Sequence, residues 1–164
     1  MELKDLLPGI IGSFVGVMGW LLVGLLIQRR QFMRQARNAA KAVYFELDVN
    51  RMALAVALDH GSFTPLNRSS FERLLPELAT ILSAADLKSV VGAYMAHAGY
   101  EQLSGDANLP AQVRRRALTE IVGLHDKALA TLATCAFSKQ DAHLMRAGAT
   151  DAQRSADEPH RVIS

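Results

Sequence analysis

The first strong pattern in the chain is an uncharged apolar run, "PGIIGSFVGVMGWLLVGLLI", over residues 8–27. A helix rises about 1.5 Å per residue, so this run spans roughly 30 Å, the thickness of the hydrocarbon core of a bilayer. A buried helix of a soluble protein normally keeps a polar face, and this run has none. The pattern therefore predicts a transmembrane helix over 8–27.

The residues before this run distinguish an anchor from a cleaved signal peptide. Signal peptides begin with a basic segment and end at a cleavage site of small residues. Residues 1–7 carry Glu2 and Asp5 against Lys4, and no small-x-small site follows the run. We expect an uncleaved anchor, preceded by a short extracytoplasmic N-terminus over 1–7.

A second apolar pattern, with heptad spacing, follows the run. Residues 28–60 contain no proline or glycine, so they predict one helix that continues out of the anchor. Asn50 falls at an a-type position, where a polar residue fixes register, and Glu46 lies one turn before it on the same side. The seam positions are Met33, Ala36, Ala40, Val43, Leu47, Asn50, Leu54 and Ala57. Such a seam fits an intramolecular bundle or a freestanding parallel coiled coil, and the helices that follow favour the bundle.

Three shorter helices are predicted after a loop that contains Gly61 and Pro65. Pro76 should interrupt or end the first turn of the first helix, and the last helix should run to about Arg146. The expected capping residues are Ser69 with Glu72, Ser83 with Asp86, and Asn108 with Pro110 in the first turn. The expected faces are Leu87, Val91, Tyr94 and Ala98, and then Val113, Ala117, Ile121, Leu124 and Ala128, widened by Leu118, Val122, Leu129 and Leu132.

These patterns predict an all-α protein whose single N-terminal span continues into a cytoplasmic antiparallel helical bundle over residues 28–146. Residues 147–164 have no apolar period and should form a disordered tail. The composition agrees with helices, because half of the residues are hydrophobic and only 6% are aromatic.

The charge distribution predicts an orientation. The net charge of +2 gives no strong field for nucleic acid, and we expect no nucleic-acid partner. Residues 1–41 nevertheless carry a net charge of +4 and the remainder −2. The positive-inside rule then places the bundle in the cytoplasm and the N-terminus outside, in a bacterial inner membrane. The candidate lipid-headgroup residues are Arg29, Arg30, Arg34, Arg37 and Lys41.

Small residues recur along one side of the predicted span. Helices associate in lipid through close backbone approach, which small side chains permit. The candidate packing face consists of Gly9, Gly12, Gly16, Gly19 and Val23. Its partner is a transmembrane helix of a second copy or of another protein.

The chain offers little sign of catalytic or metal chemistry. No H-x-x-x-H or Glu-x-x-His pair occurs, so the histidines are expected to be solvated or satisfied by backbone groups. The single cysteine, Cys135, reads as a small core residue. We expect no metal, no cofactor and no enzymatic activity. An enzyme would need a pocket lined by Glu46, Asn50, Tyr94 or His97.

Three stretches carry a resemblance: "YFELDVNRMALAV", "FTPLNRSSFERLLPELATILS" and "LKSVVGAYMAH". With the span before them they resemble uncharacterised small bacterial single-pass membrane proteins, over roughly residues 1–103. The matching features are Glu46 with Asn50 on the helix after the span, Phe71 after a serine, and Tyr94 on a later helix. The resemblance implies a bacterial membrane-anchored helical protein and no activity.

The sequence thus predicts a non-enzymatic, membrane-anchored interaction, scaffold or accessory subunit, with a protein partner in the cytoplasm. The alternative is a phage-type envelope-lysis or envelope-spanning protein, which also combines one N-terminal span with helical segments. That alternative requires the long C-terminal part to lie outside the cytoplasm, against the flanking charges.

Overall fold

The structure, a computed structural model, describes residues 3–106, 108–138 and 141, with side chains from Gly12 onward. Its elements are α1 (Leu3–His60), α2 (Ser69–Ile81), α3 (Ala84–Gly105) and α4 (Ala111–Ala136). The described residues contain no strand. The all-α prediction is therefore confirmed.

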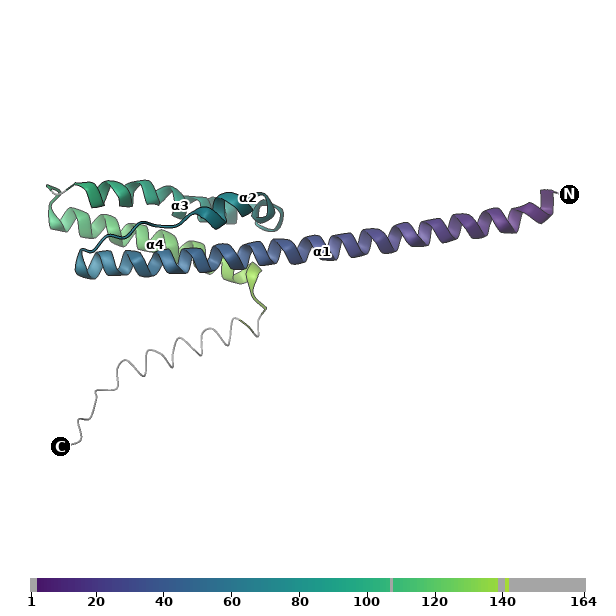
Figure 1. Cartoon of the computed structure of the whole chain (residues 1–164), viewed down its shortest axis with the longest axis horizontal. Coiled ribbons are helices and arrows are strands. Elements are labelled where there is room, and N and C mark those ends of the chain that lie inside the picture. Colours follow the sequence, from purple (N-terminus) through teal and green to yellow (C-terminus); the bar gives the residue numbers. More distant parts are fainter. Residues whose placement is uncertain (1–2, 107, 139–140, 142–164) are drawn as a thin grey trace, which may run out of the picture.

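Helix α1 dominates the molecule with 58 residues, a length of about 87 Å. Its C-terminal half packs against α2, α3 and α4, and its N-terminal half extends away from them alone (Figure 1). The helix ends where Gly61 adopts a φ of +67° and donates its N–H to the Ala57 carbonyl at 3.0 Å. A residue with a Cβ would be strained in this left-handed conformation.

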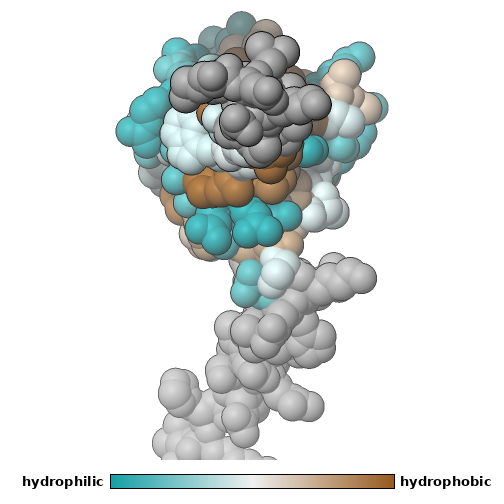
Figure 2. All heavy atoms as spheres, turned by 90° about the vertical axis from the view of Figure 1, so that its right-hand side faces the viewer, coloured by the Kyte–Doolittle hydropathy of each residue, from teal (hydrophilic) through white to brown (hydrophobic). Residues whose placement is uncertain are grey.

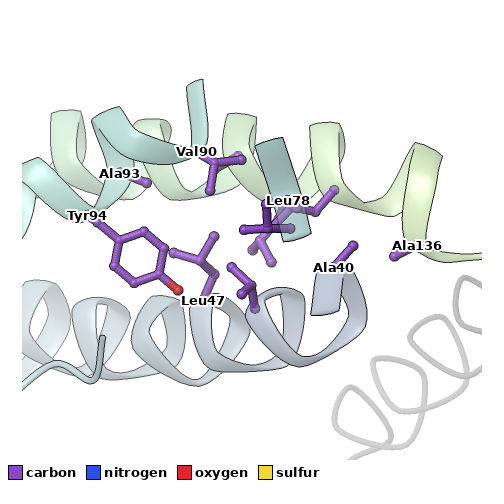
Figure 3. Close-up of a cluster of buried hydrophobic side chains, with 11 residues drawn as sticks. Ala40, Leu47, Leu78, Val90, Ala93, Tyr94 and Ala136 are labelled. Atoms are coloured by element: carbon purple, nitrogen blue, oxygen red, sulfur yellow. The ribbon is translucent and has the colours of Figure 1, made fainter. Parts of the chain in front are cut away.

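The heptad seam of α1 is the buried face of this helix. Six of its apolar members and Asn50 are at most 2% exposed; the apolar members are Ala36, Ala40, Val43, Leu47, Leu54 and Ala57. Met33, the first predicted seam residue, is 40% exposed and lines a hollow with Ile81 and Ala136 at the edge of the bundle. The seam packs within the chain, as Figure 3 shows around Leu47, and this confirms the bundle over the freestanding coiled coil.

The core consists of two clusters along the bundle, in which α4 runs antiparallel to both α1 and α3 (Figure 1). The cluster nearer the projecting half of α1 joins Leu47 to Leu78 of α2, Val90 of α3 and Leu132 of α4. The cluster at the far end joins Leu54, Ala57, Tyr100, Leu118 and Ile121. Burial of these side chains contributes roughly 1.5–3 kcal/mol for each large aliphatic residue.

Several predicted helix boundaries in the first half of the bundle need correction. Pro76 lies inside α2 and does not end it. Pro76 is exposed, so the carbonyl one turn earlier, which lacks a proline N–H donor, lies on a side that water can reach. The Ser69–Glu72 capping box is also absent, because Arg68 occupies the N-cap position and pairs with Glu72 at 2.9 Å.

The later helix boundaries agree in part. Ser83 caps α3 as predicted, since its Oγ accepts from the Asp86 N–H at 3.2 Å. Asn108 does not cap α4, because Pro110 occupies the N-cap position and the Asn108 N–H instead donates to the Asp106 side chain at 2.9 Å.

Helix α4 ends at Ala136, ten residues before the predicted end at Arg146. Phe137 is extended, with φ −110° and ψ 147°. After it, the Ser138 N–H donates to Asp141 Oδ2 at 3.2 Å, and the Asp141 N–H donates to Ser138 Oγ at 3.1 Å. This reciprocal capping stabilises a break in the helix. The predicted tail over 147–164 lies outside the described residues.

The buried face of α3 is also rotated from the predicted one. Its buried residues are Val90, Ala93, Tyr94, His97 and Tyr100, and Ala98 is exposed. On α4, Val113 and Leu124 are 52% and 41% exposed, and His125 is fully buried. The cause is that polar residues with internal partners take core positions that an apolar pattern assigns to their neighbours.

Candidate functional site

The projecting part of α1 presents an exposed apolar surface, which we call the apolar rod (residues 12–27). Phe14, Trp20 and Leu25 are 66%, 76% and 62% exposed, and the most apolar stretch of the helix has no residue buried inside the chain. Figure 2 views the molecule from this end and shows hydrophobic residues at the surface. By length and composition α1 can cross a membrane.

Basic side chains gather on one side of α1 between the rod and the bundle. We call Arg29, Arg30, Arg34 and Arg37 the basic collar; all four are exposed and line one shallow hollow together with Leu26 and Met33. The fifth predicted headgroup residue, Lys41, is half-buried, with its Nζ 5.7 Å from the centre of the Phe137 ring. Guanidinium groups bind phosphate well, so the collar suits anionic lipid headgroups.

The predicted glycine face lies open on the rod. A Cβ added at Gly12, Gly16 or Gly19 would meet no other atom within 4 Å, and Val23 is 54% exposed. Gly9 lies outside the residues whose side chains are described. None of the described residues occupies this face at Gly12, Gly16 and Gly19, and its role in helix packing stays a prediction.

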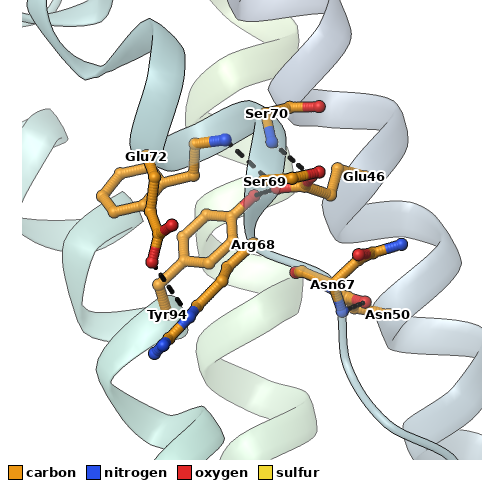
Figure 4. Close-up of polar contacts among 9 residues, drawn as sticks. Glu46, Asn50, Asn67, Arg68, Ser69, Ser70, Glu72 and Tyr94 are labelled. Carbon is orange, nitrogen blue, oxygen red and sulfur yellow. Dashed lines mark hydrogen bonds and ion pairs between the residues drawn. The ribbon is translucent and has the colours of Figure 1, made fainter.

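A second site is the polar network around Glu46, which joins three helices (Figure 4). The Glu46 carboxylate accepts the Ser70 N–H at 2.6 Å and the Phe71 N–H at 3.2 Å, and so caps the start of α2 from α1. It also accepts the hydroxyl of Tyr94 on α3 at 2.7 Å. Tyr94 in turn stacks on Phe71, with ring centroids 4.1 Å apart. Two of the free N–H groups at the start of α2 thus receive a charged acceptor.

Two further side chains hold the loop between α1 and α2. Asn50 donates to the Asn67 carbonyl at 2.6 Å and accepts the Asn67 N–H at 2.8 Å. Tyr100 of α3 binds Thr64 similarly, accepting its N–H at 3.1 Å and donating to its carbonyl at 3.0 Å. The predicted register residues, Glu46 and Asn50, therefore lie side by side where the loop enters α2, and a function in register stays a prediction.

The network shifts the pKa values of Glu46 and Tyr94 in opposite directions. Burial raises the pKa of Glu46, but the hydrogen bonds from Ser70, Tyr94 and Phe71 outweigh burial and hold this pKa below its usual value. Burial and the Glu46 carboxylate raise the pKa of the Tyr94 hydroxyl. At neutral pH, Glu46 is therefore a carboxylate and Tyr94 a neutral donor.

The sequence reasoning missed a buried histidine pair. His97 of α3 and His125 of α4 are 3% and 0% exposed, and their Nε2 atoms lie 3.2 Å apart. His125 Nδ1 lies 3.0 Å from the Ile121 carbonyl, which can only accept, so this nitrogen carries the proton. His97 Nε2 then donates to His125 Nε2, and His97 Nδ1 has no partner among the described residues. The backbone contact of His125 agrees with the expectation for histidines, and the pairing does not.

The histidine pair predicts sensitivity to acid. Burial, and then the neighbouring His125, lower the pKa of His97 from 6.5 to about 4, and burial lowers that of His125. Both histidines bind protons more readily in the unfolded chain than in the folded one. The stability that the neutral pair contributes is therefore fully present above pH 6.5 and is lost progressively as the pH falls towards 4. We expect the free energy of unfolding to fall by about 2 kcal/mol between about pH 7 and pH 5, measured by denaturant titration in detergent.

The exposed His60 provides the control for this pH prediction. A His60→Gln variant should keep the acid dependence, and a variant with His97→Leu and His125→Leu should lose it in this range. Wild-type stability that stays constant from about pH 7 to pH 5 would contradict the prediction.

The described residues contain no group of three or more His, Cys, Asp or Glu able to hold a metal ion. Cys135 is half-buried, and burial raises the pKa of its thiol, so at neutral pH the group is a protonated thiol. Glu46, Asn50, Tyr94 and His97 lie in one region of the bundle, and their contacts include one another, His125, the Ser69 and Phe71 side chains, and the backbone of α2 and its loop.

No family model, curated protein or solved structure matches this chain. The likeness to small bacterial single-pass proteins rests on the residues alone. What the structure itself defines is an all-helical protein with a packed bundle and one helix long and apolar enough to cross a membrane.

Proposed function

We propose that the protein is a membrane-anchored helical interaction or accessory subunit without enzymatic activity. One observation carries this proposal: the most apolar stretch of the rod has no residue buried among the described residues, yet the helix continues without a break into a well-packed bundle. A rod of large exposed apolar side chains is stable only when lipid or another protein covers it. The rod supplies the anchor, and the bundle is the part that a partner in the cytoplasm binds.

The basic collar supports a bacterial inner membrane with the bundle inside. Its four arginines lie directly after the rod, and residues before the rod bring only Lys4 against Glu2 and Asp5. Each basic residue near an anionic surface adds about 1 kcal/mol to the attraction. The same arginines would oppose transfer of the bundle across the membrane.

The glycine face supports a partner within the bilayer, and its substitution tests the proposal. Gly12→Ile with Gly16→Ile should remove the complexes that the wild-type chain forms with another transmembrane helix, because the added side chains separate the backbones. Chemical crosslinking in native membranes measures this. A variant with Met18→Ile and Leu25→Ile, on another side of the rod, is the matched control.

Unchanged complexes in the glycine variant would exclude the glycine face from the function. Orientation is tested by adding protease to intact spheroplasts, where the bundle should be protected. Cleavage of the bundle under these conditions would favour the phage-type envelope protein instead.

A further inference from the structure

Helix α1 carries a second apolar seam on the side opposite its buried face, where Phe45 also meets the ring of Phe137 edge-on, with centroids 6.1 Å apart. Phe45, Val49, Met52 and Val56 are 52%, 55%, 54% and 43% exposed, although they lie on the packed half of the helix. Their spacing of four, three and four residues is that of a heptad. At 3.6 residues per turn, they lie on the side of α1 opposite Leu47 and Leu54, which face the core.

The same spacing continues towards the N-terminus without meeting a charge. With the four residues above, the outer seam comprises Phe14, Val17, Leu21, Gly24, Gln28, Gln31, Gln35, Asn38 and Ala42. Eight charged residues lie between positions 14 and 56, and all of them fall off this seam. Covering the seam would therefore bury no charged side chain, whose desolvation would oppose the pairing of two helices.

The occupant that the seam fits best is a second copy of this chain. Two chains inserted in one bilayer in the same orientation run parallel, so each seam position meets its own counterpart; this step rests on the proposed function. Gln28, Gln31, Gln35 and Asn38 are consecutive in the seam, and Gln35 and Asn38 also line a shallow hollow beside Leu74 and Glu77 of α2. Each of these amides both donates and accepts. In a parallel pair identical amides face each other and can exchange hydrogen bonds, as polar residues at core positions of coiled coils do.

We propose that two copies pair in parallel through the outer seam, with a coiled coil over residues 28–56 that continues into the bilayer. The glycine face lies on roughly the opposite side of the rod from Val17 and Leu21, by the same helical geometry. The pair therefore leaves the glycine face free for the transmembrane helix of a different protein.

Disulfide crosslinking of the full chain in membranes tests the pairing. In a Cys135→Ala background, Met52→Cys and, separately, Phe45→Cys should give disulfide-linked dimers under mild oxidation, because each residue faces its own counterpart. Met95→Cys, which is 71% exposed on α3, is the matched control and should give few. Adding Val49→Glu to Met52→Cys should reduce the dimer about tenfold or more, because two carboxylates then face each other.

Several results would overturn the pairing. Equal crosslinking at Met95 would show random collision, and a crosslink between Phe45→Cys and Val56→Cys chains, without self-crosslinks, would show an antiparallel pair. A Met52 crosslink to a different protein would replace the second copy. If the chain fractionates with membranes but the Met52→Cys variant gives no dimer, the pairing fails and the proposed function stands. If the chain does not fractionate with membranes, the proposed function fails, and crosslinking of the Met52→Cys variant still measures the pairing.

Discussion

Replacing Glu46 with alanine is expected to lower the free energy of unfolding of the bundle by about 3 kcal/mol. The substitution removes one carboxylate that serves the Ser70 and Phe71 N–H groups and the Tyr94 hydroxyl. A hydrogen bond to a charged group contributes about 1.5–3 kcal/mol, and the partly buried donors left behind would lack an acceptor. Denaturant unfolding of the full chain in detergent, followed by circular dichroism, measures the change.

Glu72→Ala is the matched control for this substitution. Glu72 lies on α2 and is exposed in an ion pair with Arg68, so its loss should change stability by less than about 0.5 kcal/mol. Glu46→Gln should fall between the two, because it keeps an acceptor oxygen and loses the charge. A Glu46→Ala variant as stable as the Glu72→Ala variant would show that the network does not stabilise the bundle.

Two arginines in the middle of the apolar rod are expected to release the protein from membranes. Met18→Arg with Leu22→Arg places two charges near the centre of the 8–27 run, where each costs about 2.5–3.5 kcal/mol on insertion scales. Among the residues searched, α1 is the one helix able to span a bilayer. Both side chains also lie off the glycine face and the outer seam, so a change reports on insertion. Flotation with vesicles and extraction at alkaline pH measure the bound fraction.

The control carries the same two charges on the bundle. Met95 and Val113 are exposed on α3 and α4, so Met95→Arg with Val113→Arg should leave the bound fraction unchanged. If the Met18 and Leu22 variant still floats with vesicles, the rod is not what holds the protein in lipid, and the membrane-anchored function is wrong.

The sequence predicted the parts of the fold that periodicity controls. The heptad spacing identified the buried face of α1 from Ala36 to Ala57, and the absence of proline and glycine predicted the unbroken helix to His60. Ser83 was predictable because its partner, Asp86, is three residues away. Each of these signals lies within one helix, so the neighbouring helices do not need to be known.

The polar contacts could not be predicted because they join residues distant in the sequence. Glu46 and Tyr94 are 48 positions apart and His97 and His125 are 28 apart, and nothing local marks either pair. One usable signal for His125 was its place among apolar neighbours, four residues after Ile121 and three before Ala128. The proposed roles of the glycine face and the collar depend on lipid and on partners, which the chain alone does not contain.

The unbroken course of α1 has a mechanical consequence in a bilayer. Between the last residue of the apolar rod, Ile27, and the first buried bundle residue, Ala36, the helix advances only about 13 Å and has neither glycine nor proline to act as a hinge. If α1 spans a bilayer as proposed, the bundle and the span share one continuous helix. A tilt or an axial turn of the span, imposed by a neighbouring helix, would then be transmitted along α1 to the bundle.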